Sequence, residues 1–393
     1  MKSYGREIFD KIVDKENIRL AICNSSKGKR HRRDVKKVLE NIDKHIDKVH
    51  KILTEDLYVP RITKERIINE NDHRHKTRKI RKPKFIYDQI IHHAIIQIIK
   101  PLIIRTLIHH AYGSVPNRGL HKAGEYLKEW LKDYKKTKYC FKMDIQKFYE
   151  SIDKSILKRK LTTMFRDKRL TSVLFKIIDS FPDKGIPLGL YTSQWFVLIY
   201  ISELDHYIKE ELRQKYYIRY MDDMVILSGN KKELHKIKDK IILYLKEKLN
   251  LRLKSNYQIF KISYIDNKGK ERGRPLDFLG FLFYHNKTII RKHDMLALTR
   301  KATKVSKKPY KRLTKNDCLS LISRLGILQH TNTYKMAEKY VFSKVNIRNL
   351  KTKVSIMDRQ AIGKYIDSSK NKNLSSKEKA IKFKSKIRLK NSV

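Results

Sequence analysis

Two adjacent carboxylates stand in the middle of the apolar run 216–228 (YYIRYMDDMVILS). Residues that favour β-strands flank them on both sides. A strand interior does not hold two charges without compensation, so the pattern predicts a hairpin with Asp222 and Asp223 displayed in its turn. A divalent ion such as Mg²⁺, which prefers hard oxygen ligands, would offset their repulsion. The alternative interpretation is a solvated turn without chemistry.

A third carboxylate favours chemistry. Asp144 ends the β-prone run 139–145 (YCFKMDI). If this strand lies beside the hairpin, Asp144 meets Asp222 across it, and two metal ions can be held between them. One ion activates an attacking 3′-hydroxyl, and the other neutralises the triphosphate and the departing pyrophosphate. The sequence therefore predicts a nucleotidyl-transfer site at Asp144, Asp222 and Asp223 with two Mg²⁺ ions, for which Mn²⁺ can substitute.

Helices must hold these strands in place. Residues 8–59 mix apolar and charged positions at helical spacing, which predicts two or three surface helices. The basic stretch 76–81 predicts a strand or hairpin arm. Further helices are expected over 88–99, stopped by Pro101, over 156–181, over 193–212, over 231–250 and beyond 288.

The charge of the chain points to its partner. There are 92 Lys+Arg against 41 Asp+Glu among 393 residues, a formal net charge of +51. A chain this basic repels itself when compact, so a polyanion is the natural partner. Charge alone favours a generic nucleic-acid binder, such as a ribosome-associated protein.

The cysteines indicate a reducing compartment. Cys23, Cys140 and Cys318 lie far apart and form no CxxC pair, so neither a zinc ribbon nor a disulfide framework is expected. Residues 1–18 lack an apolar signal core. There is also no run of about 18 apolar residues of the kind that spans a membrane. These features predict a cytoplasmic protein without a membrane partner.

Six segments together resemble the reverse transcriptases. FKMDIQKFYESID is similar to their motif A, GIPLGLYTSQWF to motif B and YIRYMDDMVIL to motif C. LDFLGF resembles the primer grip, and KTRKIRKPKF and SVPNRGLHKA resemble the fingers motifs. The order and spacing agree over roughly residues 61–284.

The resemblance implies an α+β fold, a right-hand polymerase with fingers, a ferredoxin-like palm and a helical thumb. The expected division is an N-terminal helical extension over 1–60, fingers over 61–125, palm over 126–285, and a basic helical thumb and tail over 286–393.

The resemblance also implies roles for residues. Metal ligands are Asp144, the Ile145 carbonyl and Asp222, with Asp223 as a neighbouring carboxylate. Tyr149 matches the position of a bulky residue that excludes a ribose 2′-hydroxyl in this family. Lys254 lies near the position of the family's motif D lysine, which can protonate the departing pyrophosphate. The remaining expected residues are Lys76, Arg78 and Arg118 for the triphosphate, Leu188, Gly189 and Gln194 in motif B, and Phe278, Leu279 and Gly280 in the primer grip.

Motif B favours one subtype. Leu188 stands where many relatives have Gln, and Ser193-Gln194 replaces Ser-Pro. This pattern resembles diversity-generating retroelement reverse transcriptases, which copy RNA with low fidelity and bind a basic accessory protein. The expected partners are a noncoding or template-repeat RNA, a DNA primer and product, and dNTPs.

Two alternatives stay open. One is an antiphage defence reverse transcriptase that makes DNA from a noncoding RNA or without a template. The other is an RNA-binding splicing factor of the group II intron type, although the Cys/His pairs of an HNH endonuclease are missing after the thumb.

Overall fold

A computed structural model describes residues 3–5, 7–61, 65–69, 77–181 and 184–368. The chain folds into two compact units, each built from two separate segments. Unit 1 contains Met1–Ala123 and Cys140–Ile259, and unit 2 contains Gly124–Tyr139 and Phe260–Val393. The helices described in both units include none long and apolar enough to cross a membrane.

A five-stranded sheet forms the centre of unit 1, in the order β3-β5-β6-β4-β7. Strands β5 and β6 form the predicted hairpin, in which Tyr220 pairs with Asp223. Strand β4 lies next to β6, which confirms the neighbourhood expected from the sequence. The strands are β3 (Ala111–Tyr112), β4 (Tyr139–Asp144), β5 (Tyr216–Tyr220), β6 (Asp223–Ser228) and β7 (Gln258–Lys261).

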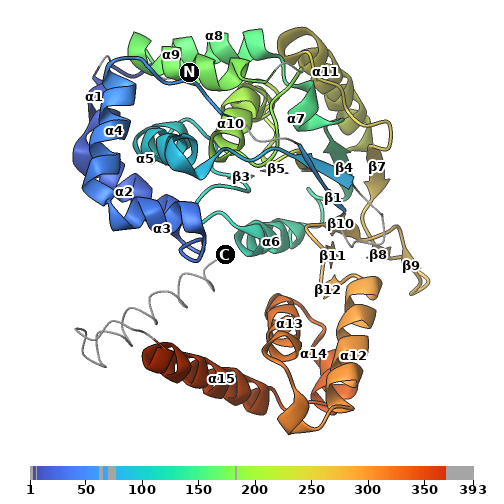
Figure 1. The fold of residues 1–393 in the computed structure, drawn as a ribbon. Helices are drawn as coiled ribbons and strands as arrows, with labels where there is room; N and C mark the ends of the chain where they lie inside the picture. Colours follow the sequence, from blue (N-terminus) through green and yellow to red (C-terminus); the bar gives the residue numbers. More distant parts are fainter. Residues whose placement is uncertain (1–2, 6, 62–64, 70–76, 182–183, 369–393) are drawn as a thin grey trace. The chain divides into compact units, whose positions relative to one another are not determined.

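Helix α10 (Tyr191–His206) is the buried helix of unit 1, because apolar side chains cover nearly all its sides. It packs against helices α5, α8 and α11. Figure 1 shows α10 next to strands β3 and β5, with α8 and α9 on the other side of α10. The surrounding helices are α5 (Ile90–Ile104), α8 (Lys154–Met164), α9 (Lys168–Asp179) and α11 (Lys231–Leu249).

Four helices precede the sheet, rather than the two or three expected. They are α1 (Ile8–Val13), α2 (Lys15–Ser26), α3 (Arg33–Glu40) and α4 (Ile42–Thr54). The extra helix arises at Asp14, which ends α1 and caps α2 by accepting the Asn17 N–H at 3.0 Å. One Asx cap thus splits what periodicity alone reads as one segment.

Two predicted helix boundaries are wrong. Residues 156–181 form two helices, because the backbone is extended at Phe165 and Asp167. Asp167 then caps α9 by accepting the backbone N–H groups of Arg169 and Leu170. Helix α5 does not stop before Pro101 but includes it. Proline removes one hydrogen bond there, and the helix continues for less than one turn, with Arg105 N–H donating to the Pro101 carbonyl at 3.3 Å.

The predicted basic arm is a strand. Strand β2 (Thr77–Ile80) pairs antiparallel with β1 (Arg66–Asn69). Its end contacts motif B, since Ile80 bridges to Leu188 and Arg81 N–H donates to the Leu188 carbonyl at 2.9 Å.

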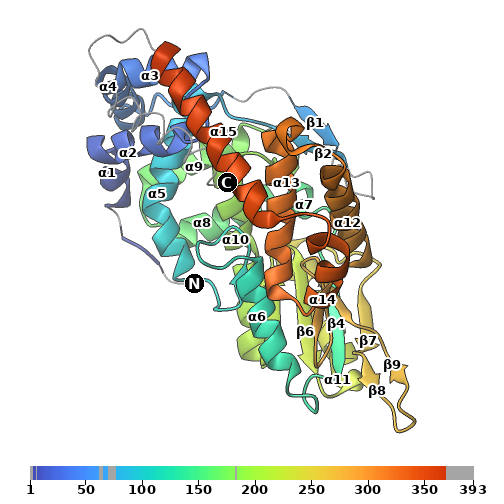
Figure 2. The same ribbon diagram turned by 90° about the horizontal axis from the view of Figure 1, so that it is seen from below.

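Unit 2 combines two small sheets with a helical region. A hairpin of β8 (Tyr264–Ile265) and β9 (Glu271–Arg272) accompanies a three-stranded sheet of β10 (Leu276–Phe278), β11 (Phe281–Phe283) and β12 (Thr288–Ile290). Helix α13 packs against both α12 and α15, as Figure 2 shows. The helices are α6 (Leu120–Leu131, shared with unit 1), α12 (Lys292–Ser306), α13 (Lys315–Leu325), α14 (Tyr334–Ala337) and α15 (Ile347–Ser368).

Candidate active site

Asp144 and Asp222 lie together at the ends of neighbouring strands. Asp144 is the last residue of β4, and Asp222 occupies the turn between β5 and β6. The Ile145 N–H donates to the Asp222 carbonyl at 3.4 Å, and the two carboxyl groups are within hydrogen-bonding reach. In extended backbone the N–H and C=O of one residue point to the same side. The Ile145 carbonyl therefore faces the Asp222 side of β4.

Lys254 approaches Asp144 from the opposite side. Its N–H donates to the Asp144 carbonyl at 2.8 Å, and its ammonium group contacts the Asp144 carboxylate. Gln146 N–H donates to the Arg252 carbonyl at 2.9 Å, which fixes the segment after α11 alongside β4. The structure thus brings Asp144 and Asp222 together, as expected from the sequence, and places Lys254 in the same group.

The site carries excess negative charge. Burial, together with the nearby Asp144 carboxylate, raises the pKa of Asp222 above its usual range. Burial raises the pKa of Asp223 to about 7, against the opposing effect of Lys142 on β4. Like charges held close in a desolvated place disfavour ionisation. The fold therefore holds carboxylates that lack sufficient positive charge around them.

The donor set fits a divalent cation. One buried oxygen of Asp144 and one of Asp223, the Oδ1 atoms, have no hydrogen-bond partner within the described chain. Buried carboxylate oxygens without donors are unfavourable unless a cation takes the place of the donor. The described residues contain no group of three or more His, Cys, Asp or Glu already arranged around a common ion position. Asp144, Asp222 and Asp223, with the Ile145 carbonyl, are the residues that would hold the ion.

A buried ion pair holds the turn that carries Asp222. Arg219 and Asp205 are both fully buried, with Nη2 and Oδ2 2.6 Å apart and Nε and Oδ1 2.8 Å apart. The Tyr217 hydroxyl donates to the same carboxylate at 2.7 Å. Arg219 Nη1 donates to the Met221 carbonyl at 3.1 Å. The guanidinium group therefore fastens the turn to α10, which carries Asp205.

This turn is strained, which explains why it is held at several points. Met221 has φ of 56°, an uncommon conformation for a residue with a side chain. Its N–H donates to the Tyr112 carbonyl at 3.1 Å. Gly113 leaves the room for its side chain, because a Cβ there would lie 2.7 Å from the Met221 Cγ.

The sequence reasoning missed both Arg219 and Asp205. A signal was present at Arg219, which is a charged residue inside the otherwise apolar run YYIRY. Charged side chains are almost never fully buried unless they are paired, so this position predicts a buried acidic partner. Asp205 does not stand out in the same way, because Glu203 and Glu210 lie in the same segment.

A cavity of about 490 Å³ lies in unit 1 between β2, α7 (Phe148–Ser151) and motif B. Tyr149 and Leu188 line it, together with Lys79 and Arg81 from β2 and its end. A basic, partly apolar cavity of this size suits a nucleotide. The sequence predicted Tyr149 and Leu188, whereas Lys79 and Arg81 were missed.

Two glycines of motif B permit close backbone contact. Gly189 has φ of +106°, and a Cβ there would lie 2.5 Å from the Arg81 carbonyl oxygen. Gly185 has φ of +86°, and a Cβ there would lie 2.5 Å from the Tyr149 carbonyl oxygen. The loop can therefore pack directly on β2 and α7, with Ile186 N–H donating to the Tyr149 carbonyl at 2.9 Å.

Arg118 and Gln194, two other expected site residues, lie outside this cavity. The Arg118 guanidinium donates to the Ile108 carbonyl at 2.8 Å and does not line the cavity. Gln194 is exposed on α10, also outside the cavity lining. Lys76 lies outside the described residues, and Arg78 is described only as backbone in β2.

The expected primer grip lies in unit 2. Phe278 is buried at the end of β10, and Leu279 and Gly280 form the turn into β11 with φ of 54° and 88°.

Comparison with known families decides the class of protein. Residues 62–283, more than half of the chain, match the model of the reverse transcriptase (RNA-dependent DNA polymerase) family. The chain belongs to the reverse transcriptase family. Members are nucleotidyltransferases that use divalent metal ions, and the match confirms the α+β right-hand polymerase fold expected from the sequence. None of the curated protein sequences matches the chain.

Among solved structures, this reverse transcriptase is similar to telomerases. Apo telomerase from Candida tropicalis is 14% identical, with a TM-score of 0.45 over 83% of this chain and 62% of that chain. Its form truncated from the C-terminal domain is 14% identical, with a TM-score of 0.39 over 61% and 57%. Telomerase from Candida albicans, in complex with the TWJ fragment of telomeric RNA, is 10% identical, with a TM-score of 0.42 over 85% and 64%. The chain thus spans less than two thirds of each of these telomerase chains.

Proposed function

We propose that this chain is an RNA-directed DNA polymerase that adds dNTPs to a 3′-hydroxyl at Asp144, Asp222 and Asp223. The observation that carries the proposal is the meeting of Asp144 and Asp222 on neighbouring strands, with buried carboxylate oxygens that have no donor. Two Mg²⁺ ions bound there, or Mn²⁺ in their place, would supply the positive charge that phosphoryl transfer needs.

The chain's own residues would orient the nucleotide. Tyr149, which lines the cavity beside motif B, would lie under the incoming deoxyribose and leave no room for a 2′-hydroxyl. Lys79 and Arg81 line the same cavity and can hold phosphate oxygens. Lys254, in contact with Asp144, is placed to give a proton to the departing pyrophosphate. The fingers, palm and thumb divisions, including the primer grip at 278–280, belong to the same proposal.

The test is DNA synthesis on a primed RNA template with dNTPs and Mg²⁺ or Mn²⁺. Asp222→Asn and Asp144→Asn should each lower the single-turnover rate by about a thousandfold, since metal-supplied charge stabilisation is worth several kcal/mol. Asp239→Asn is the matched control, because Asp239 is an exposed carboxylate on α11. Near wild-type synthesis by either site variant would overturn the assignment.

A finer proposal concerns fidelity and rests on Leu188. We propose that the enzyme works in a diversity-generating retroelement, copies a template-repeat or other noncoding RNA and binds an accessory protein. Leu188 lines the nucleotide cavity but offers no hydrogen-bond donor. A lost hydrogen bond of about 1 kcal/mol lowers discrimination several-fold.

Sequencing of cDNA made from a defined RNA tests this proposal. Wild-type enzyme should misincorporate most often opposite adenine, and Leu188→Gln should restore accuracy in part. Leu190→Gln, a buried position beyond the cavity lining, is a control for general damage. Accurate copying of adenine by the wild type would favour the alternative, an antiphage defence polymerase. RNA binding by the wild type without any DNA synthesis would favour the splicing-factor alternative.

A further inference from the structure

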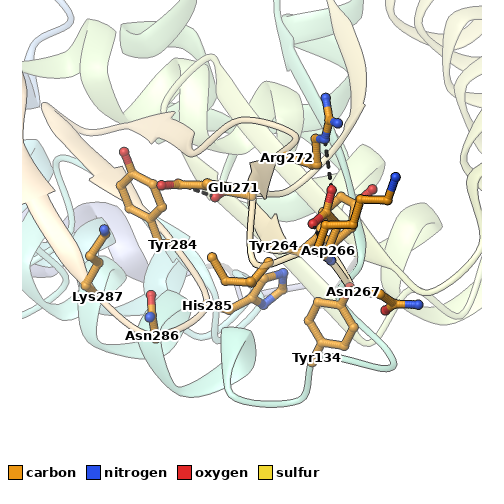
Figure 3. Close-up of a pocket in the computed structure, with 13 residues that line it drawn as sticks. Tyr134, Tyr264, Asp266, Asn267, Glu271, Arg272, Tyr284, His285, Asn286 and Lys287 are labelled. Carbon is orange, nitrogen blue, oxygen red and sulfur yellow. Dashed lines mark hydrogen bonds and ion pairs between the residues drawn. The ribbon is translucent and has the colours of Figure 1, made fainter.

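A second cavity lies in unit 2 and shares no residue with the candidate active site. Its volume is about 820 Å³. The β8–β9 hairpin, the turn from β11 to β12 and the loop after α6 surround it, as Figure 3 shows. All of its lining residues belong to the described part of unit 2.

Aromatic side chains from all three segments line this cavity. They are Tyr264 on the hairpin, Tyr284 at the turn and Tyr134 on the loop. Tyr134 is 37% exposed. His285 meets the Tyr134 ring edge-on, with centroids 4.8 Å apart, and its Nδ1–H donates to the Leu131 carbonyl at 2.9 Å. Three tyrosines from separate segments therefore present their rings to the cavity and are not part of a hydrophobic core.

Each tyrosine ring has a lysine ammonium close to it. The distances from Nζ to the ring centroid are 3.5 Å for Lys261 at Tyr264 and 4.7 Å for Lys287 at Tyr284. For Lys138 at Tyr134 the distance is 5.9 Å. Positive charge therefore accompanies every ring of the cavity.

The acidic side chains of the cavity are already engaged. Asp266 accepts the N–H groups of Lys268 and Lys270 at 2.9 Å each and pairs with Arg272 at 3.1 Å. Glu271 accepts the Ser263 hydroxyl at 2.5 Å. Residues 261–274 carry five Lys or Arg against these two acids. The acids therefore stiffen the hairpin, and the excess charge facing a ligand is positive.

We propose that this cavity binds unpaired bases of a single-stranded polynucleotide, stacked on Tyr264 and Tyr284, with phosphates near Lys268 and Lys287. Rings beside cations are the combination that binds single strands, because every base has a flat face and every phosphate a charge. A duplex would use only the lysines, since its bases are already stacked. An acidic peptide would also leave the rings unused. The single strand is an unpaired stretch of RNA or newly made DNA.

Crosslinking and affinity measurements test the proposal together. A short oligonucleotide carrying one photoreactive pyrimidine, made as RNA and as DNA, is crosslinked to the full chain, and the peptides are mapped by mass spectrometry. We expect crosslinks at Tyr264 or Tyr284. The stronger of the RNA and DNA arms identifies the source of the strand.

The variants separate stacking from charge. Tyr264→Ala/Tyr284→Ala should lower single-strand affinity about fivefold or more, with an unchanged slope of log affinity against log salt. Tyr264→Phe/Tyr284→Phe keeps the rings and should bind like the wild type. Lys268→Gln/Lys287→Gln should lower that slope, because the slope counts neutralised phosphates.

Controls make the result decisive. Tyr334→Ala removes a tyrosine that is 64% exposed on α14, outside the cavity, and should change neither crosslinks nor affinity. A blunt duplex of the same length should lose no affinity in the Tyr→Ala variant. Crosslinks that map elsewhere, or equal losses for duplex and single strand, would overturn the proposal. Crosslink positions and affinities are measured without DNA synthesis, so this test is independent of the result for the active-site variants.

Discussion

At the scale of single residues, the candidate site is defined by charge without sufficient compensation. Asp222 and Asp223 both have pKa values raised by burial and by neighbouring carboxylates. The ordinary Asp pKa lies near 3.8, so between that pH and about pH 7 the folded protein binds more protons at Asp223 than the unfolded chain does. The contribution of Asp223 to stability must then fall as pH rises through this window.

Without divalent ions, we expect the free energy of unfolding of the wild type, measured relative to that of Asp223→Asn, to fall between pH 5 and pH 7 by up to about 1.4 kcal/mol per pH unit. The comparison with the variant is needed because burial lowers the pKa of His92, His93 and His110, which makes the stability of both proteins rise with pH over part of this window. Urea unfolding in EDTA at several pH values measures the difference. Asp239→Asn, at an exposed position, should follow the wild type. Mg²⁺ should raise the stability of the wild type at pH 8. A difference between wild type and Asp223→Asn that stays constant across this window in EDTA would contradict the described environment of Asp223.

The buried pair of Arg219 and Asp205 gives a second prediction at this scale. Arg219→Met leaves a buried carboxylate unpaired and should destabilise the protein by about 3–5 kcal/mol. Arg219→Met/Asp205→Leu should recover most of that stability, because buried ion pairs are often replaceable by apolar residues. The double variant should still synthesise DNA slowly, since the Met221 carbonyl has lost its donor.

Urea unfolding and single-turnover synthesis, measured side by side, separate the two effects. Tyr217→Phe is the matched control, because it removes a hydrogen bond to Asp205 without touching the turn. Full activity in the stable double variant would show that Arg219 has no part in positioning Asp222.

Some site residues can be recognised from their neighbours in the sequence, whereas others depend on a partner that is distant in the sequence. Asp144 and Asp222 stand out because a carboxylate at a strand end is conspicuous in the sequence itself. Arg219 and Asp205 meet only in the folded chain, because they lie 14 positions apart on different elements. Arg118 shows a related limit, since a phosphate-binding arginine and one that donates to a loop carbonyl, as Arg118 does here, are alike in sequence.

At the scale of elements, the position of the motif B loop depends on close contacts between its backbone and that of β2 and α7. Gly189→Ala should raise the dNTP KM by roughly tenfold or more, since small displacements near a reacting group are costly. The added Cβ would lie 2.5 Å from the Arg81 carbonyl oxygen on the arm that borders the cavity. Steady-state kinetics on a primed template measures the change.

Gly269 provides the control for backbone strain. It also has positive φ, +73°, but a Cβ there meets nothing within 4 Å. Gly269→Ala therefore carries the conformational cost without the clash, and its dNTP KM should stay near that of the wild type. If Gly189→Ala and Gly269→Ala raised the dNTP KM equally, the close contact at Gly189 would not be the cause.

Elements were predicted well where one signal governs them and poorly where two compete. The β5–β6 hairpin and β4 follow from β-propensity and from the pair of carboxylates between the two arms, and both are present. The break at Asp167 was missed because the surrounding periodicity is helical on both sides, and a single capping carboxylate outweighs it. Pro101 was read as a stop, although near the end of a helix it removes one hydrogen bond and leaves the rest intact.

At the scale of the whole molecule, charge dominates. A net charge of +51 spread along the chain predicts that RNA affinity falls roughly a thousandfold between 50 and 200 mM salt, if about six phosphates are neutralised. Filter binding or fluorescence anisotropy across this range measures the slope. Arg300→Gln/Lys304→Gln, at two exposed positions one turn apart on α12, should lower the slope by up to about 2. A flat response would show that binding does not depend on phosphate contacts.

The strand order of the central sheet has a consequence for synthesis on the ribosome. Strand β4 lies between β6 and β7, and both are made after it. Its neighbour β6 ends at Ser228, 84 residues after Asp144 (228 − 144). At about 5–20 residues per second, the nascent strand waits roughly 4–17 s without a partner. During that interval Cys140, Phe141 and Met143, all buried in the finished fold, have no sheet to enter. The strand that carries the first carboxylate is therefore a segment of the newborn chain that a chaperone would protect.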